Sequence, residues 1–444
     1  MSGVFLGIYS GLMHLAQPLL RRKMAKRALQ EPGYGEATDE RFGSYTHPRE
    51  ASPNLVWVHA VSLGETRTAA ILLQGLRAQY PGLRILLTHG TATGRAAGKA
   101  LLQPGDVQVW QPWDSRGVVE LFLNHFKPRL CLLMETEVWP SLVASAQARR
   151  IPLVLVNGRM SEKSLKQALM MSPLAYPAYG AMTAVYAQSP ADAQRFRQLG
   201  VGVSGVFGNL KFDAAPNAGQ QAIGKAWRKE LNQAVILFAS SRSGEEALFL
   251  KEIVAITQQI RVKNATDSVA CKYLMVPRHP QRFDEVEALV VKLGLKLSRR
   301  STWSGSPFDN IQAMQADVWL GDTLGEMSLY YSLADVALLG GSFEKFGGQN
   351  LIEAAACGCP VLMGPHTFNF LEAAELAEAA GAAQGVTDMA AAVTSAVQCI
   401  NNVEKKSRMS QAAIAFAASH QGATQRTVNA LAAYLSTAAT NADR

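Results

Sequence analysis

The chain has 444 residues, which is too long for one ordinary hydrophobic core and therefore favours two domains. Apolar residues make up 48% of it and charged residues 18%, a composition that excludes an intrinsically disordered protein. The net charge of +8 is modest and favours anionic partners, such as phosphorylated substrates, acidic lipids or nucleic acid.

The N-terminal segment, residues 1–30, combines an apolar stretch with a basic one. Its first twenty residues contain no Asp, Glu, Lys or Arg, and the run RRKMAKR follows at residues 21–27. A secretory signal peptide carries its positive charge before the apolar stretch, so this order argues against one. We expect a membrane-associating helix whose basic run contacts anionic headgroups of the cytoplasmic leaflet. The alternative is a core helix followed by a solvated basic tail.

Residues 31–212 have the pattern of a doubly wound α/β domain. From residue 55 onward, short apolar runs alternate with amphipathic stretches of helix length. Continuous apolar runs are typical of a parallel sheet that is covered by helices on both faces. The expected strands are LVWVHA, RILLTHG, VQVWQP, RLCLLME, PLVLVNG and AVYAQS.

Residues 213–420 repeat this pattern and predict a second domain of the same kind. A less regular stretch with Pro216, at about 209–232, is the expected linker between the domains. Residues 421–444 are expected to form a C-terminal helix that packs back across the junction. The strands expected in the second domain are AVILFAS, CKYLMVPR, ADVWLGDT, DVALLGG and PVLMG.

Two Rossmann-like domains in tandem are expected to face each other across a cleft, with ligands bound at the carboxyl ends of the strands. Neither domain has G-x-G-x-x-G after its first strand, and no P-loop motif occurs in the sequence. These absences disfavour a dehydrogenase and a P-loop NTPase. Polar side chains at the strand ends are therefore the candidates for function.

The strand-end candidates of the first domain are carboxylates and cations. Glu65 follows VWVHAVSLG at a strand–helix junction, where it is either a solvated surface charge or a catalytic group. Glu135 and Glu137 end another strand and point opposite ways, so one can face the cleft while the other caps a helix or forms an ion pair. Cationic groups suit a substrate that carries a carboxylate or a phosphate. The cationic candidates are Arg95, Arg159 and Lys211.

The strand-end candidates of the second domain suit a nucleotide. Arg278 and His279 leave a strand end, where a guanidinium can neutralise a phosphate. Asn350 and Glu353 are three residues apart on an expected helix and can hold the two hydroxyls of a ribose. The segment LGEM begins another helix, whose free backbone N–H groups can bind a phosphate. The remaining candidates for binding the nucleotide are Ser240, Gly325, Glu326 and Met327.

Seven motifs occur in a fixed order along the chain: AQPLLRRK, HAVSLGE, METEVWP, GNLKFD, VPRHPQRF, GDTLGEMSLYY and GGQNLIEAAACGCPV. Together they resemble the 3-deoxy-D-manno-oct-2-ulosonic acid (Kdo) transferases of lipopolysaccharide assembly, an inverting glycosyltransferase family with the GT-B fold. In the segment ASSRSGEE, Ser241 and Arg242 stand where the family has a Thr-His pair.

The resemblance implies a CMP-Kdo donor in the second domain and a lipid A precursor, lipid IVA, as the acceptor. It maps the general base onto Glu65, which would take the proton of the attacking hydroxyl. A position at a helix N-terminus favours the ionised carboxylate. The lipid acceptor implies a location on the cytoplasmic side of the inner membrane, either peripheral or with a single N-terminal anchor.

No cofactor is expected. No Asp-x-Asp lies at an expected strand end, and a helix dipole with Arg278 can replace a metal ion, so we expect transfer to be independent of metal. The five cysteines are scattered, which indicates reduced thiols in a cytoplasmic protein. The pair in CGC at residues 357–359 has no matching Cys/His pair, so small buried residues are favoured over a metal site there.

Two other functions fit parts of the sequence. One is another GT-B enzyme that uses a different nucleotide sugar, such as a hexosaminyltransferase or a nucleotide-sugar epimerase. The other is a non-catalytic membrane scaffold or nucleic-acid-binding protein, which only the net charge and the basic run support. No basic stretch interleaved with aromatic residues occurs, so we expect no nucleic-acid partner.

Overall fold

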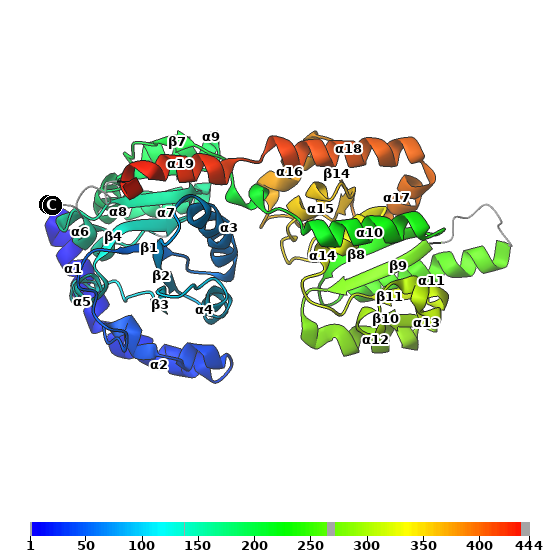
Figure 1. Ribbon diagram of the computed structural model, residues 1–444, viewed down its shortest axis with the longest axis horizontal. Helices are drawn as coiled ribbons and strands as arrows, with labels where there is room; N and C mark the ends of the chain where they lie inside the picture. Colours follow the sequence, from blue (N-terminus) through cyan, green and yellow to red (C-terminus); the bar gives the residue numbers. More distant parts are fainter. Residues whose placement is uncertain (1, 137, 264–270, 437–444) are drawn as a thin grey trace. The chain divides into compact units, whose positions relative to one another are not determined.

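The computed structural model describes residues 2–136, 138–263 and 271–436, and the chain divides into two compact units (Figure 1). Unit 1 consists of Met1–Asp213 and Gln421–Arg444, and unit 2 consists of Ala214–His420. Unit 1 is therefore built from two separate stretches of the chain.

The core of unit 1 is a seven-stranded sheet with the order β3-β2-β1-β4-β5-β6-β7, in which all pairs are parallel. The six strands predicted from the sequence are present, and a seventh of only two residues follows them. The strands are β1 Leu55–His59, β2 Arg84–His89, β3 Val107–Trp110, β4 Pro128–Met134, β5 Leu153–Gly158, β6 Ala184–Ala187 and β7 Gly205–Val206.

Helices cover both faces of this sheet, which explains why its strands are continuously apolar. In β1, Leu55 and Trp57 join the hydrophobic core on one face, whereas Val56 and Val58 join the core on the other. The covering helices are α3 Leu63–Gln79, α4 Ala92–Lys99, α5 Arg116–Phe126, α6 Pro140–Ala148, α7 Glu162–Met170, α8 Ser172–Gly180, α9 Pro190–Gln198 and α19 Ala423–Leu435.

The N-terminal segment forms two helices, α1 Ser2–Leu15 and α2 Gln17–Ala28. Within the described residues, neither is long and apolar enough to cross a membrane alone, but the pair passes that test together across a bend of 48°. Short 3-10 turns, η1 Pro32–Gly35 and η2 Thr38–Phe42, then lead towards the sheet.

Unit 2 contains a second parallel sheet of seven strands, with the order β10-β11-β9-β8-β12-β13-β14. The prediction of two doubly wound parallel domains is thus confirmed. The strands are β8 Ala234–Ser241, β9 Cys271–Pro277, β10 Leu297–Arg299, β11 Val318–Leu320, β12 Val336–Leu339, β13 Val361–Met363 and β14 Ala383–Gly385.

The stretch expected to be an irregular linker contains a helix, α10 Ala218–Glu230, so that expectation was wrong. Asn217 caps this helix by accepting the N–H of Gln220, and Gly224 lets it approach the carbonyl oxygen of Leu329 closely. The other helices of unit 2 are α11 Glu245–Lys263, α12 Phe283–Lys292, α13 Ile311–Gln315, α14 Met327–Leu333, α15 Ile352–Ala356, α16 Leu371–Ala379, α17 Met389–Asn401 and α18 Val403–Ser419.

Candidate active site

The candidate residues of unit 1 gather where the central strands of its sheet end. Strands β1, β4 and β5 are neighbours in the sheet, and their carboxyl ends lead to Glu65, Glu135 and Arg159 respectively. Ligands of open parallel sheets bind at such ends. The topology thus brings together groups that are nearly one hundred residues apart in the sequence.

Glu65 lies in the first turn of α3, where the N-cap residue Ser62 and the preceding Val61 form hydrogen bonds with it. The hydroxyl of Ser62 accepts the N–H of Glu65 at 3.3 Å and donates to Oε1 of the same residue at 3.0 Å. The backbone N–H of Val61 donates to Oε2 at 2.7 Å. Both carboxylate oxygens therefore have a fixed direction, and no long side chain lies at Gly64 beside them.

Glu135 adopts a left-handed backbone conformation with φ of 57°, which is rare for a residue other than glycine. Its Oε1 accepts a hydrogen bond from Nζ of Lys211 at 3.0 Å, and both side chains are largely buried. The neighbouring strand ends in a second such residue, Asn157, with φ of 55°. Backbone strain of this kind gathers at functional sites. Glu137 lies outside the described residues.

Asn157 was not predicted as a site residue, although it positions one. Its Oδ1 accepts the N–H of Leu210 at 2.9 Å, and Leu210 immediately precedes Lys211. The carboxyl end of β5 thereby fixes the turn that carries the lysine. The sequence signal was the Asn-Gly pair that ends this strand, which is typical of a left-handed turn.

Arg159 and Arg95 have different surroundings. Arg159 donates its backbone N–H to the carbonyl oxygen of Glu135 at 3.2 Å, and its side chain is exposed. The side chain of Arg95 is instead buried in an ion pair, with Nη1 at 2.7 Å from Oε2 of Glu40. Arg95 is therefore engaged within the protein, whereas Arg159 is open to solvent.

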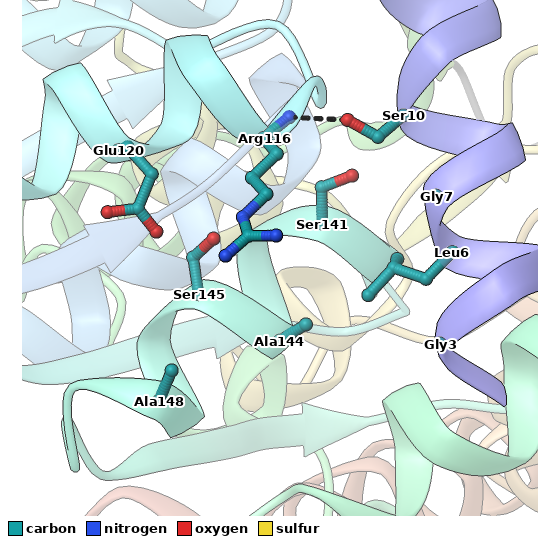
Figure 2. Close-up of a pocket in the computed structure, with 10 residues that line it drawn as sticks. All are labelled: Gly3, Leu6, Gly7, Ser10, Arg116, Glu120, Ser141, Ala144, Ser145 and Ala148. Atoms are coloured by element: carbon teal, nitrogen blue, oxygen red, sulfur yellow. Dashed lines mark hydrogen bonds between the residues drawn. The ribbon is translucent and has the colours of Figure 1, made fainter.

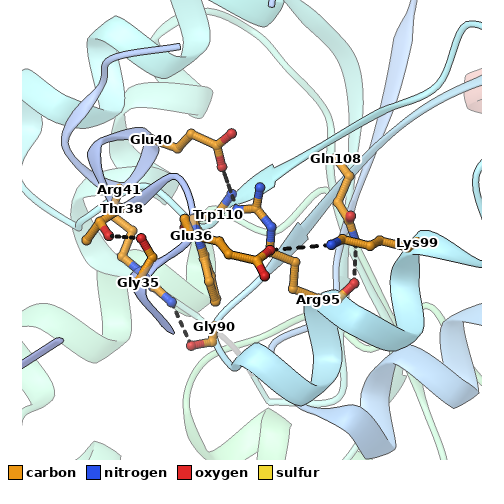
Figure 3. Close-up of polar contacts among 10 residues, drawn as sticks. All are labelled: Gly35, Glu36, Thr38, Glu40, Arg41, Gly90, Arg95, Lys99, Gln108 and Trp110. Atoms are coloured by element: carbon orange, nitrogen blue, oxygen red, sulfur yellow. Dashed lines mark hydrogen bonds and ion pairs between the residues drawn. The ribbon is translucent and has the colours of Figure 1, made fainter. Parts of the chain in front are cut away.

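The ion pair of Arg95 belongs to a polar network that joins the N-terminal segment to β3 (Figure 3). Glu40 also accepts the backbone N–H of Trp110 at 2.9 Å. The guanidinium groups of Arg41 and Arg95 lie 4.0 and 4.9 Å from the centre of the Trp110 ring. This network fixes the segment at residues 36–41 against the sheet.

In unit 2, the candidate Ser240 lies at the end of β8, where the strand's register is irregular between Ala239 and Ser241. Ser240 has φ of 56°, and a Cβ at Gly340 would clash with its carbonyl oxygen. The central strands β8 and β12 therefore end in close contact, and a glycine is required between them.

Glu245 organises the loops at this sheet end, a role that the sequence analysis missed. It is fully buried, and its carboxylate accepts the N–H groups of Arg242 at 2.9 Å, Gly341 at 2.7 Å and Phe343 at 3.0 Å. Burial raises the pKa of Glu245, while these backbone hydrogen bonds act in the opposite direction. The charged pair in SGEE was the signal available in the sequence.

His279 receives a hydrogen bond from Arg242, whose Nη1 lies 2.7 Å from Nε2 of the imidazole. Because a guanidinium can only donate, Nε2 is the acceptor and the proton of the neutral ring lies on Nδ1. Burial, Arg242, Arg278 and Arg282 lower the pKa of His279. The Arg242 guanidinium also lies 4.7 Å from the centre of the Phe346 ring. Arg242, one of the two residues that depart from the family pattern, therefore fixes the ring of His279, a predicted donor-binding residue.

The helix start predicted near LGEM is present, because α14 begins at Met327 and Gly325 precedes it with φ of 82°. The carboxylate of Glu326 accepts hydrogen bonds from Nη2 of Arg300 and from the hydroxyl of Tyr330, each at 3.0 Å. The side chain of Glu326 is thus bound to unit 2 itself.

Asn350 and Glu353 do not share a helix face as predicted. Helix α15 begins at Ile352, so Asn350 lies in the preceding turn, where its Oδ1 accepts the N–H of Ile352 at 3.0 Å. Glu353 is on the helix, and its Oε1 accepts the hydroxyl hydrogen of Ser328 at 2.9 Å. This hydrogen bond joins the first turns of α14 and α15.

Comparison with known proteins identifies a family. Residues 36–214 match the family model described as 3-deoxy-D-manno-octulosonic-acid transferase (kdotransferase). The chain is 44% identical to the 3-deoxy-D-manno-octulosonic acid transferase of Bordetella pertussis, over 97% of this chain and 99% of that one. It is 30% identical to the enzyme of the same name from Haemophilus influenzae, over 96% and 98% of the two chains.

Among solved structures, the chain is similar to the UDP-GlcNAc 2-epimerase of Neisseria meningitidis, with a TM-score of 0.55 over 85% of this chain and 99% of that one. The identity is 14%, so this likeness shows the fold and carries nothing about the reaction. The epimerase alternative therefore gains no support from it. The matches over nearly the full length decide the family: the chain belongs to the 3-deoxy-D-manno-octulosonic acid transferases, which are glycosyltransferases, and it has the GT-B fold.

Proposed function

We propose that this Kdo transferase uses CMP-Kdo as the donor and a lipid A precursor, lipid IVA, as the acceptor, and that it inverts the configuration of the transferred sugar. The observation that carries the proposal is the fixed carboxylate of Glu65 at the end of β1, where Ser62 and Val61 orient both of its oxygens. A base must be held in one direction to take a proton in the transition state.

In this mechanism the acceptor hydroxyl attacks the anomeric carbon of Kdo from the face opposite the CMP group. The bond between that carbon and the phosphate oxygen breaks, and CMP leaves with the electron pair. Glu65 takes the hydroxyl proton as the new glycosidic bond forms. The negative charge that develops on the CMP phosphate is stabilised by Arg278, which makes this interaction stronger in the transition state than in the ground state.

The remaining candidates divide between the two substrates. In unit 2 we assign the donor to the strand-end segments with Ser240, His279 and residues 325–327, and to Asn350 and Glu353. In unit 1, Arg159 has an exposed side chain, and Lys211 is held by Glu135, so both can meet an anionic group of the acceptor or the sugar. Arg95 contributes less directly, because its guanidinium is already paired with Glu40.

We also propose that α1 attaches the enzyme to the cytoplasmic face of the inner membrane. Large apolar side chains are exposed along one side of the N-terminal segment at Val4, Ile8, Leu12, Leu15 and Leu19. The first four lie in α1, where their spacing places them on one face of the helix, and Leu19 lies in α2. The basic run in α2 supplies the positive charge that anionic headgroups attract.

The test is incubation of the full-length protein with CMP-Kdo and tetraacyl lipid A precursor, followed by mass spectrometry of the lipid. We expect the lipid mass to increase by one or more Kdo residues, and we expect the rate to be unchanged by EDTA. Transfer from a UDP-sugar in place of CMP-Kdo would overturn the donor assignment and favour the other GT-B enzymes. Loss of activity with EDTA would overturn metal independence.

A further inference from the structure

A groove lies between α1 and the body of unit 1 (Figure 2). It has a volume of about 410 Å³ and runs between α1 on one side and helices α5 and α6 on the other. A second hollow of about 170 Å³ shares Gly3, Leu6 and Ala144 with it, so the two hollows adjoin at these residues and are described together as the groove. None of the site residues assigned above lines either part.

Hydrogen bonds near the middle of α1 fix this helix in place. The hydroxyl of Tyr9 is hydrogen-bonded to the buried carboxyl of Asp114, and the N–H of Arg116 donates to Oγ of Ser10 at 2.8 Å. The indole of Trp113 donates to the carbonyl oxygen of Met13 at 2.6 Å. These contacts hold the middle and the end of the helix against residues 113–116, where α5 begins.

Small residues keep the groove open. Gly3 and Gly7 present no side chain from α1, and a Cβ at either position would meet no atom within 4 Å. Ala144 and Ala148 line the opposite wall on α6. Larger side chains at these positions would fill the groove between α1 and α6.

One end of the groove is polar, and the side chain of Arg116 there is exposed to solvent. The guanidinium of Arg116 makes no hydrogen bond or ion pair with the rest of the described chain, and Figure 2 shows it pointing along the groove between Ser141 and Ser145. Ser141 is 2% exposed, and among the described residues its Oγ has no hydrogen-bond partner. Such a buried hydroxyl is costly unless a ligand or water satisfies it. The carboxylate of Glu120 also lines this end, but Arg149 pairs with it.

The other end of the groove is apolar. Beyond Leu6, the second hollow is lined by Val143, Pro173, Leu174 and Pro177, from helices α6 and α8. A cation and an unpaired hydroxyl at one end and aliphatic side chains at the other match a molecule with an anionic head and a hydrocarbon tail.

We infer that this groove holds an anionic phospholipid of the bilayer, with its phosphate at Arg116 and Ser141 and one acyl chain extending past Leu6 into the apolar hollow. The bound lipid would fix α1 in place, because it would fill the groove between α1 and the body of unit 1 while the outer face of the helix contacts the leaflet. The inference goes beyond the transfer reaction and depends on the proposed membrane attachment of α1.

The test uses the full-length protein on phosphatidylcholine vesicles that contain phosphatidylglycerol with a photoactivatable diazirine in its acyl chain. After illumination and digestion, mass spectrometry locates the label. We expect label on peptides from both α1 and α6. In Ala144→Phe the label on α6 should be lost, because the ring fills the part that the two hollows share, while binding to vesicles is retained.

A second variant tests the polar end. Arg116→Gln should reduce the labelling of α6 by phosphatidylglycerol about fivefold, which is the effect of one charge near an anionic surface. Labelling by an analogous phosphatidylcholine should stay unchanged. The matched control is Arg197→Gln, because Arg197 is an exposed residue of α9 that lines neither hollow. It removes the same charge and should leave the pattern as in the wild type.

Three outcomes would overturn the inference. Label confined to the exposed side of α1 would show that lipid contacts only the outer face. Equal labelling of α6 in Ala144→Phe would place the chain elsewhere. Displacement of the label by stoichiometric tetraacyl lipid A precursor would assign the groove to the acceptor instead. A protein that does not bind vesicles at all would instead show that the proposed membrane attachment is wrong.

Discussion

The ammonium group of Lys211 donates to Oε1 of Glu135 across 3.0 Å, and this pair joins the end of β4 to the last turn before unit 1 gives way to unit 2. Glu135 holds a left-handed conformation with φ of 57° at that point. The lysine is therefore not a solvated charge, and its position depends on Glu135.

Lys211→Met should destabilise the protein more than the loss of both partners does. The change leaves a largely buried carboxylate without its donor, which costs about 1–3 kcal/mol. In Lys211→Met combined with Glu135→Gln that unpaired charge is absent, so the free energy of unfolding should partly recover while transfer stays low. Urea unfolding and turnover are measured for the wild type, Lys211→Met, Glu135→Gln and the double variant. The four values give the coupling free energy between Lys211 and Glu135. If the effects of the two single variants on the free energy of unfolding were strictly additive, Lys211 and Glu135 would not interact. Lys211→Arg is the control, because it keeps a cation that can pair with Glu135.

Glu65→Gln should lower kcat by about 10²–10⁴, the usual contribution of a general base, with little change in KM for either substrate. Glutamine is the suitable replacement because alanine would also remove the side chain that accepts from Val61 and Ser62. Ser62→Ala is the control for the capping role. It removes one of the two groups that orient the carboxylate, so it should cost about 1 kcal/mol of stability and lower kcat, but less than Glu65→Gln does. Wild-type turnover in Glu65→Gln would reject the base.

Arg242→Met should raise KM for CMP-Kdo about tenfold, since a hydrogen bond from a charged donor is worth about 1.5–3 kcal/mol. It should also raise the pKa of His279 towards 6.5, because Arg242 is one of the three cations that lower it. NMR titration of the labelled imidazole reads that shift. Arg408→Met, at an exposed position of α18, is the matched control. An unchanged His279 titration would show that the contact has no influence on the ring.

Ile8→Asp and Leu12→Asp should each weaken binding to anionic vesicles about tenfold or more, because burial of one such side chain is worth about 1.5–3 kcal/mol. Turnover of a water-soluble deacylated acceptor should be unaffected. Ile311→Asp places the same charge at an exposed apolar position of unit 2 and is the control. Vesicle sedimentation measures the effect, and equal losses in all three variants would contradict a specific role for α1.

The stability of unit 1 should fall as the pH decreases below 6.5. Burial lowers the pKa of His59 to about 3 and that of His89 to about 4, so between those values and 6.5 the unfolded chain binds protons that the folded one does not. Each histidine then contributes a slope of about 1.4 kcal/mol per pH unit. Burial raises the pKa of Asp114 from 3.8 to about 6, so between these pH values the folded protein binds a proton that the unfolded chain does not. In this range Asp114 cancels the contribution of one histidine to the slope.

Hydrogen exchange of the peptides that contain β1 and β2, corrected for intrinsic rates, measures this loss between pH 7 and 5. In His59→Asn the pH dependence should be shallower by the contribution of one histidine. An identical dependence in wild type and variant would show that His59 is not a source of the effect.

The sequence predicted the fold because the relevant signals are local. Continuous apolar runs such as LVWVHA indicate strands buried on both faces, and the structure places all six of the first set and all five of the second in parallel sheets. Short elements with weak signals were missed, such as β7 with two residues and β10 with three. Helix α10 was missed because its polar, exposed face dominates its composition.

Side-chain partners were harder to predict, because they depend on contacts between distant segments. Nothing near Arg95 indicated that Glu40 would pair with it, since the two are 55 residues apart. Likewise, the contact of Arg242 with His279 spans 37 residues, and the sequence showed only that Arg242 departs from the family pattern. Strand ends can be predicted from periodicity, but the pairing of charges around them follows from the folded topology.

The two-segment composition of unit 1 sets an order for its completion during synthesis. Val428, Leu431 and Leu435 of α19 belong to the same hydrophobic core as Leu72 of α3 and Val56 of β1, and Asp213 accepts the N–H of Gly422 at 2.6 Å. Translation delivers about 5–20 residues per second, so the part of this sheet face that α19 covers stays exposed for the time needed to make all of unit 2. The domain that leaves the ribosome first is thus the one that is finished last.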